Sequence, residues 1–439
     1  MRGTIFLLRR CVIKFIVEPS NLKGEARIPG SKSNTTRAVV IASLAEGRSV
    51  IKNPLPSADC LSTVEVYKRY GARVLSLGKE WIIEGSYENP KLPDDVLNTG
   101  NSGTTTYIAI GTAGLIEGYT VITGDHQIRR RPSGPLLKAI EDLGGEAISV
   151  KGDGSQPVVI KGKIKGGRVY LPGVNSQWLT PLLINTPLAD GNTEIYVDNL
   201  QERPYIKMTL GWLRRCGIEY EEENMERFFL KGGQKYRNFE YEIPSDWESA
   251  CFPIVAAAIT DSDITLHGLD LNDYQGDKAI ISILQAMGAD IDTNYGGGIR
   301  IRGGKTLHGI EIDCGDTPDA PPILAVLGTQ AEGKTILNNL GASRLKETDR
   351  ARSIAEELRK MGAKIEEYED SMVIYRSDLV GARINGHTDH RIVMAMTVAG
   401  FVAKGNTIVD DAEYVKISFP NFYELMSSLG AKIERVSEV

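Results

Sequence analysis

The chain has 439 residues, of which 41% are hydrophobic and 25% charged, and its net charge is −6. This composition is typical of an ordered protein of two or three domains and indicates neither disorder nor a general nucleic-acid-binding surface. Five scattered cysteines without paired spacing favour a reducing, cytoplasmic protein over a zinc site or a disulfide framework. No stretch approaches the roughly 20 apolar residues of a membrane span.

The first residues, 1–14, carry a short apolar run between arginines. The run is far shorter than a signal-peptide core, so we expect a short N-terminal extension or a mis-set start codon.

Six helix-to-strand junctions recur along the chain. In each, an apolar helical stretch ends in a glycine that is followed by a short alternating run, as expected when glycine supplies a left-handed helix cap before a strand. One such junction would be ordinary, but these glycines lie 73, 73, 71, 74 and 68 residues apart. The spacing predicts an α/β fold of six repeated units, split as two sets of three. The glycines are Gly71, Gly144, Gly217, Gly288, Gly362 and Gly430.

A polar segment, Pro29–Arg37, interrupts this pattern before the helical stretch Ala38–Ala45. Its serine and threonine residues can cap that helix, and the free N–H groups there, together with Lys32 and Arg37, would form an anion site. An ordinary capped helix start is the alternative. The spacing of a P-loop is absent.

Two further segments combine glycine, hydroxyl groups and arginine. Asn98–Thr105 leads into a helix where the backbone can approach a ligand closely. Gly124–Pro132 contains three arginines, a residue suited to bidentate binding of carboxylate or phosphate. We expect Arg129 and Arg130 to face solvent.

Two charged segments follow near the C-terminal end. Ser343–Arg350 is predicted to open a helix that continues to Met361, with Lys346 and Arg350 on one face; a surface ion-pair ladder is the alternative. His387–Arg391 precedes an apolar run and is expected to start a helix that presents Arg391. We do not expect a metal site there, because no Glu or Cys stands at metal-site spacing.

These segments, in this order, resemble the enolpyruvylshikimate-phosphate synthases of the enolpyruvyl transferase family, from about residue 16 onward. The motifs that carry the resemblance are PGSKS-x-x-x-R, N-x-G-T, RRRP, SQ, RPY, PDA, LKETDR and DHR. The resemblance implies a two-domain inside-out α/β barrel with three βαβαββ units per domain and ligands between the domains. We assign residues 15–28 and 245–439 to one domain and 29–244 to the other.

The resemblance implies transfer of the enolpyruvyl group of phosphoenolpyruvate to the 5-hydroxyl of shikimate 3-phosphate, with release of phosphate by addition and elimination. It implies small-molecule substrates and no metal or cofactor, and we expect a monomer. Asp319 would accept the proton of the hydroxyl, and Glu347 with Lys32 would protonate the methylene carbon; which of these two is the carbon acid stays open. The implied phosphoenolpyruvate-binding residues are Lys32, Gly103, Arg131, Gln177, Arg350, Arg391 and Lys416. The implied acceptor-binding residues are Ser33, Arg37, Asn175, Ser176, Gln177, Tyr205, Asp319 and Lys346.

Several positions depart from the family pattern. Asn175 and Glu202 stand where serines usually surround the 3-phosphate of the acceptor, and a carboxylate there would repel a phosphate. Two alternatives therefore stay open: a paralogue that acts on a different, unphosphorylated cyclic alcohol, and a non-catalytic anion-binding relative. The other departures are Tyr107 for arginine, Ala342 for asparagine, and Lys416 one place before the family lysine.

Overall fold

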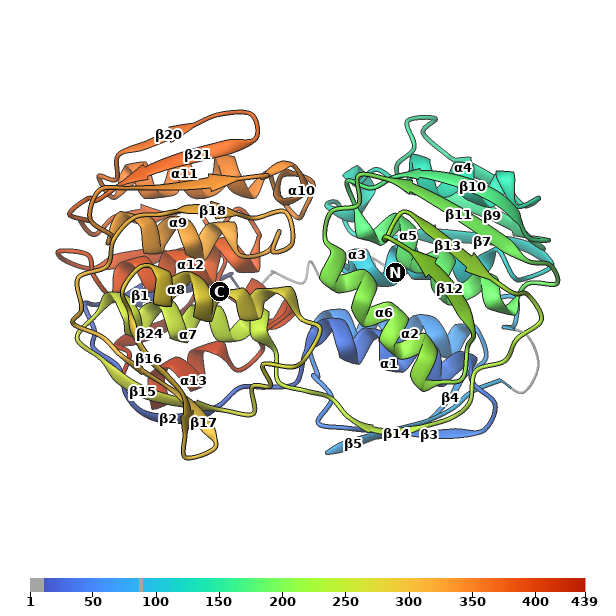
Figure 1. Ribbon diagram of the computed structural model, residues 1–439, viewed down its shortest axis with the longest axis horizontal. Coiled ribbons are helices and arrows are strands. Elements are labelled where there is room, and N and C mark those ends of the chain that lie inside the picture. The colour runs from blue at the N-terminus through green and yellow to red at the C-terminus, as the bar shows by residue number, and fades with distance from the viewer. Residues whose placement is uncertain (1–11, 87–89, 439) are drawn as a thin grey trace, which may run out of the picture.

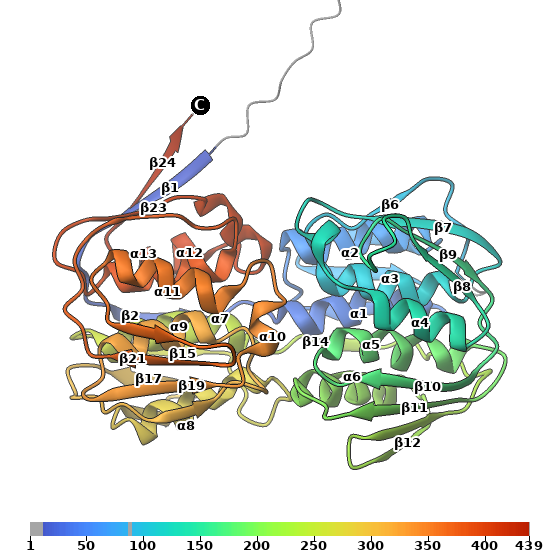
Figure 2. The same cartoon turned by 90° about the horizontal axis from the view of Figure 1, so that it is seen from above.

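Helices fill the interior of each half of the molecule, and four-stranded sheets cover its outside (Figure 1, Figure 2). The computed structural model describes residues 12–86 and 90–438. Within these ranges the chain forms six sheets, three in each half. We name the halves by their helices, the α1–α6 half and the α7–α13 half.

All six sheets in the described ranges share one topology, in which a parallel pair of strands is extended by two antiparallel strands. In the α1–α6 half the orders are β14(Glu240–Glu242)-β3(Arg48–Lys52)-β5(Glu80–Glu84)-β4(Arg73–Leu77), β6(Leu97–Asn98)-β7(Gly118–Thr123)-β9(Val158–Gly162)-β8(Glu146–Ser149) and β10(Gly167–Pro172)-β11(Thr193–Asp198)-β13(Arg227–Leu230)-β12(Tyr220–Glu223). In the α7–α13 half they are β16(Asp290–Tyr295)-β17(Gly298–Arg302)-β15(Asp263–His267)-β2(Lys23–Arg27), β18(Glu311–Asp313)-β19(Lys334–Asn338)-β21(Ser371–Tyr375)-β20(Ile365–Glu367) and β22(Arg383–Ile384)-β23(Thr407–Val409)-β1(Val12–Val17)-β24(Ile433–Glu438).

The helices follow the same division between the halves. The first half contains α1(Lys32–Leu44), α2(Ala58–Arg69), α3(Gly103–Ala113), α4(Gly134–Asp142), α5(Ser176–Asn185) and α6(Arg203–Arg215). The second contains α7(Trp247–Ile259), α8(Ala279–Ala286), α9(Pro321–Thr329), α10(Gly341–Arg344), α11(Arg350–Lys360), α12(His390–Gly400) and α13(Phe422–Ser428). The short 3-10 helices are η1(Ile128–Arg130), η2(Thr186–Leu188), η3(Gly276–Lys278) and η4(Ala412–Ile417).

The six predicted junction glycines follow α2, α4, α6, α8, α11 and α13, and each has a φ between +83° and +100°. A side chain would strain the backbone in this left-handed region, so glycine is the residue that ends these helices best. The predicted sixfold repeat and the α/β class are confirmed.

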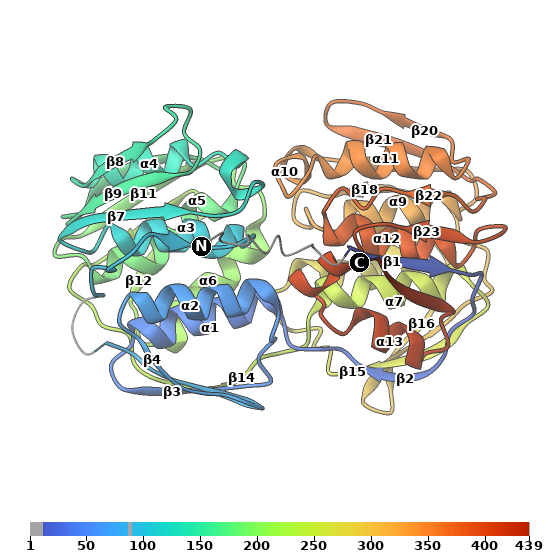
Figure 3. The ribbon, with the colours of Figure 1, turned by 180° about the vertical axis from the view of Figure 1, so that it is seen from behind.

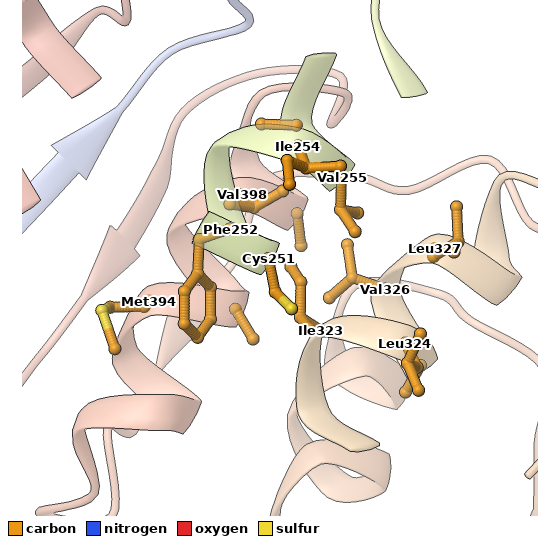
Figure 4. Close-up of a cluster of buried hydrophobic side chains, with 14 of the residues drawn as sticks. Cys251, Phe252, Ile254, Val255, Ile323, Leu324, Val326, Leu327, Met394 and Val398 are labelled. Atoms are coloured by element: carbon orange, nitrogen blue, oxygen red, sulfur yellow. The ribbon is translucent and has the colours of Figure 1, made fainter. Parts of the chain in front are cut away.

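Each half has its own hydrophobic core. One core is drawn from residues 38–243 and the other from residues 15–28 and 247–433. In the second, Phe252 of α7, Ile323 of α9 and Met394 of α12 are fully buried where the three helices meet (Figure 4). Because apolar residues surround these helices on all sides, they read as almost continuous apolar runs rather than as amphipathic stripes.

Two chain segments cross between the halves and run side by side (Figure 3). Gly30 and Ser245 form an isolated antiparallel bridge, flanked by hydrogen bonds from Ser31 N to the Pro244 carbonyl and from Asp246 N to the Pro29 carbonyl, both 2.8 Å long. The bridge and the two cores support the domain boundaries 15–28 with 245–439 and 29–244, which we keep as a proposal.

Three local predictions are wrong. β1 begins at Val12, so residues 12–14 belong to a strand that pairs with β24 and not to the predicted extension, of which residues 1–11 lie outside the described residues. α1 starts at Lys32, six residues before Ala38, because Ser31 caps it. Finally, the segment between α10 and α11 is a turn rather than the start of a helix.

The helices in the described part of the chain include none that is both long and apolar enough to cross a membrane.

Candidate active site

A cavity of about 40 Å³ lies between the two halves. This volume holds only a few water molecules. The cavity lining comes from both halves: Lys32, Ser33, Arg37, Asp59, Gly103, Thr104, Tyr107, Ile108, Arg131, Ser176, Gln177, Thr180, Glu202 and Tyr205 from the first, and Glu248, Asp319, Lys346 and Glu347 from the second.

Most of the polar lining sits in the first turn of a helix. Lys32 begins α1, Gly103 begins α3, Ser176 begins α5, and Glu248 lies in the first turn of α7. The N–H groups at a helix start lack intrahelical partners and carry the positive end of the helix dipole. Several helix starts that converge on one cavity therefore favour negatively charged ligands.

Arg131 and Arg350 share one carboxylate, that of Glu347. Arg131 Nη2 lies 2.8 Å from Glu347 Oε1, so this ion pair joins the two halves. Arg350 Nη2 donates to Glu347 Oε2, and its other guanidinium nitrogens bind Asp319 and Asp389. Arg350 is buried behind the cavity and contacts it through these carboxylates.

Arg391 and Lys32 are paired in the same way. Arg391 Nη2 donates to Glu248 Oε2, and Arg391 lies behind the lining. Lys32 Nζ lies 3.9 Å from Asp59 Oδ2. The resemblance assigns five basic residues to phosphoenolpyruvate. Four of them contact a carboxylate of the protein, namely Lys32, Arg131, Arg350 and Arg391.

Lys346 reaches across the cleft to Glu202. Lys346 Nζ donates to Glu202 Oε1 at 2.7 Å, while Ser176 donates to Glu202 Oε2 through its N–H at 2.8 Å and its hydroxyl at 2.6 Å. A further contact between the halves comes from Tyr205, whose hydroxyl lies 3.1 Å from both Asp319 Oδ2 and Glu248 Oε1.

The charges around the cavity set the protonation states of its acids and bases. Burial acts to raise the pKa values of Asp319 and Glu347, but their cationic neighbours outweigh it and hold both pKa values below the usual range. Burial acts to lower the pKa of Lys32, but Glu248 and Asp59 outweigh it and raise that pKa. At neutral pH the two acids are therefore ionised and Lys32 is protonated.

Asp59 behaves differently, because burial dominates over its weak ion pair with Lys32 and raises its pKa to about 6. His390 is also fully buried, and burial holds its pKa well below the usual range, so its ring is neutral.

The structure brings most of the predicted site residues together. Arg37 lines the cavity, although its guanidinium binds Thr209 Oγ1 and the carbonyls of Ser33 and Tyr205. Gln177 binds Thr104 across the cavity wall. As expected, Arg129 and Arg130 are exposed while Arg131 is buried.

Two predicted site residues lie elsewhere. Asn175 does not line the cavity; its side chain caps α5 by accepting a hydrogen bond from Gln177 N. Lys416 is exposed on η4, outside the cavity lining. Their assignment to ligand binding stays a prediction.

The predicted helical face that joined Lys346 to Arg350 is wrong. Asp349 caps α11, which starts only at Arg350, so Lys346 and Glu347 lie in the preceding turn. This turn lets Lys346 and Glu347 both line the cavity although they are adjacent in sequence.

Sequence reasoning missed Glu248 and Asp59. Both lie in the first turn of a helix, next to the caps Asp246 and Ser57. For Glu248 a usable signal was its position just after Ser245, because the bridge from Ser245 to Gly30 places the start of α7 beside the start of α1.

His, Cys, Asp and Glu side chains in the described ranges form no group of three or more that is arranged to hold a metal ion.

Known proteins resemble this chain over nearly its full length. A relative from Acetivibrio thermocellus, 3-phosphoshikimate 1-carboxyvinyltransferase, is 48% identical over 417 residues, which cover 95% of this chain and 98% of the relative. The protein of the same name from Ruminiclostridium cellulolyticum is 45% identical over 420 residues, covering 96% of this chain and 99% of the relative. The solved structure of EPSP synthase from Acinetobacter baumannii superposes with a TM-score of 0.82 at 30% identity, covering 97% of this chain and all of that one. A sequence model of the EPSP synthase family matches residues 16–426. From this match and the near full-length similarity, the chain belongs to the EPSP synthase (3-phosphoshikimate 1-carboxyvinyltransferase) family.

Proposed function

We propose that this protein transfers the enolpyruvyl group of phosphoenolpyruvate to the 5-hydroxyl of shikimate 3-phosphate and releases phosphate. The observation that carries the proposal is the group of four cations, Lys32, Arg131, Arg350 and Arg391, around the carboxylates of Asp319 and Glu347. Two anionic substrates repel each other, and a cleft with this many cations offsets that repulsion before bonds change.

The donor, phosphoenolpyruvate, brings a carboxylate and a phosphate to the cations. We assign its binding to Lys32, Gly103, Arg131, Gln177, Arg350 and Arg391. Arg131 and Arg350 bind Glu347 and Arg391 binds Glu248, so we expect the donor to compete with these two carboxylates for the three arginines.

The acceptor alcohol is assigned to Ser33, Arg37, Ser176, Tyr205, Asp319 and Lys346. Because the cations hold the pKa of Asp319 below the usual range, it is ionised and can accept the proton of the 5-hydroxyl as the oxygen attacks C2 of the donor. Lys32 carries a proton at neutral pH and is our candidate for the group that delivers it to the methylene carbon. Elimination then breaks the bond between C2 and the phosphate oxygen. A proton leaves the methyl carbon at the same stage, and the double bond re-forms.

The protonation of Glu347 depends on its arginine partners. Arg350 and Arg131 hold the pKa of Glu347 down against the effect of burial, so a donor that binds these arginines leaves Glu347 able to take up a proton. Glu347 with Lys32 is therefore assigned to proton transfer to and from the methylene carbon.

The test is phosphate release from phosphoenolpyruvate by the purified protein, with shikimate 3-phosphate and with unphosphorylated shikimate as alternative acceptors. We expect release with the phosphorylated acceptor and its loss in Lys32→Met. Release with shikimate alone would instead favour the paralogue that takes an unphosphorylated alcohol. No release with either, together with binding of both substrates, would favour a non-catalytic anion-binding protein.

A further inference from the structure

The carboxylate of Glu202 occupies a place built for an anion. Its side chain is 1% exposed, and three donors converge on it: Lys346 Nζ, Ser176 N and Ser176 Oγ. Two of these donors come from the start of α5 and the third from the opposite half. A helix start, a hydroxyl and a lysine are the groups that bind phosphate in proteins.

The backbone at Glu202 is arranged to deliver this carboxylate. Glu202 has φ +54° and ψ +33°, a left-handed conformation that costs energy for a residue with a side chain. It is the N-cap of α6, yet its side chain makes no capping bond to α6 and turns to α5 instead. Its own N–H donates to the Gly315 carbonyl of the other half at 3.0 Å.

Glu202 thus connects the halves through both its backbone and its side chain. Lys346 would otherwise be a buried cation without this partner, and Glu202 together with Asp319 keeps its pKa raised although burial acts to lower it. An unpaired buried charge is unfavourable, so each member of the pair depends on the other for its place in the cleft.

We propose that Glu202 is an internal substitute for the phosphate group of the acceptor, which must displace the Glu202 carboxylate from Ser176 and Lys346 in order to bind. This inference rests on the proposed function, since it names the group of the acceptor that competes. Glu202 is accordingly a specificity-determining residue that weakens binding of the phosphorylated acceptor. No bond is made or broken by Glu202.

The test measures binding of shikimate 3-phosphate and of shikimate by titration calorimetry to the full-length wild type, Glu202→Gln and Glu202→Ser. Gln keeps the shape and removes the charge, whereas Ser also leaves room for a phosphate oxygen. We expect shikimate 3-phosphate to bind at least about tenfold more tightly to both variants, because like charges placed together oppose binding strongly. Binding of shikimate, which carries no phosphate, should not tighten.

Two controls separate this effect from a general loss of negative charge. Glu221→Gln changes an exposed glutamate on β12 and should leave both affinities unchanged. Adding Lys346→Met to Glu202→Gln should remove most of the gain, because the freed lysine is the phosphate partner.

Equal or weaker binding of shikimate 3-phosphate by both Glu202 variants would overturn the inference. If the wild type neither binds nor turns over shikimate 3-phosphate, the proposed function fails separately. Binding of inorganic phosphate then decides the inference. Tighter binding of phosphate to Glu202→Gln than to the wild type would support it, and equal or weaker binding would overturn it.

Discussion

Arg131 of one half and Glu347 of the other form an ion pair of 2.8 Å at the centre of the cleft. The same carboxylate also binds Arg350. One acidic side chain therefore neutralises two arginines that we assign to the donor, and it does so only while the two halves are together.

Replacement of Glu347 by Gln should lower kcat by about 10²-fold or more, the usual size of a lost acid–base group. Without a ligand the variant should also be less stable, since Arg131 stays buried without its carboxylate partner and Arg350 keeps only Asp319 and Asp389. Phosphoenolpyruvate should therefore raise the melting temperature of the variant more than that of the wild type. Steady-state kinetics and thermal unfolding with and without the donor check both points, and Glu369→Gln, on the surface of the same half, is the control. An unchanged kcat would remove Glu347 from the chemistry.

Replacement of Asp319 by Asn should lower kcat by roughly 10²- to 10⁴-fold, because no other group is assigned to accept the hydroxyl proton. The pKa of Asp319 is held below its usual range, so protonation of Asp319 should not lower the wild-type rate even near pH 4, about the pKa of an ordinary Asp. A pH–rate profile measures this. Asp94→Asn, on an exposed loop, serves as the control. Retained turnover in Asp319→Asn would assign the base elsewhere.

Replacement of Gly103 by Ala should raise the KM for phosphoenolpyruvate. A Cβ at this position would collide with Nη1 of Arg131, so the guanidinium must shift. A displacement of about 1 Å at a binding group can cost up to roughly 10²-fold in rate. Steady-state kinetics should show the main effect on the donor rather than on the acceptor. Gly78→Ala, where a Cβ meets no atom closer than 3.7 Å, should behave as the wild type.

Replacement of Asp59 by Asn should change how stability depends on pH. Burial raises the pKa of Asp59 to about 6, above its value in the unfolded chain, so the folded protein binds the additional proton between these two values. The wild type should lose stability relative to Asp59→Asn as the pH rises from about 4 to about 6, by on the order of 2 kcal/mol in the free energy of unfolding, and the difference should be constant above pH 7. Denaturant unfolding at several pH values measures the difference. A difference that does not vary with pH would show that Asp59 does not titrate in this range.

The sequence was sufficient for the features that depend on local pattern. The junction at Gly362, for example, needs only a helix, a left-handed residue and a strand, and all three are visible in neighbouring residues. Lys32 and Arg391 were found because each belongs to a polar segment that opens an apolar helix.

The rest depends on contacts that no local pattern encodes. Glu248 is adjacent to an unremarkable helix cap, and it becomes part of the site only because two crossings of the chain run together. The charges around Lys346 repeat with helical spacing, so the sequence predicts a helix there. In the structure this segment is a turn, because Asp349 caps α11 only after it and Lys346 pairs with Glu202 of the other half.

The paired crossings at Gly30 and Ser245 make this edge of the junction the expected hinge for any movement of the two halves. The two segments are joined by a β-bridge and form a hinge. Figure 1 places them at one edge of the junction, while α10 lies toward the opposite edge. For a given rotation of the two halves about this hinge, the starts of α1 and α7 would move least because they lie next to it. Lys346, just beyond α10, would move further. We therefore expect opening about this hinge to preserve the neighbourhood of Lys32 and Glu248 and to separate Lys346 from Glu202, so that one part of the site would persist and the other would be assembled at each closure.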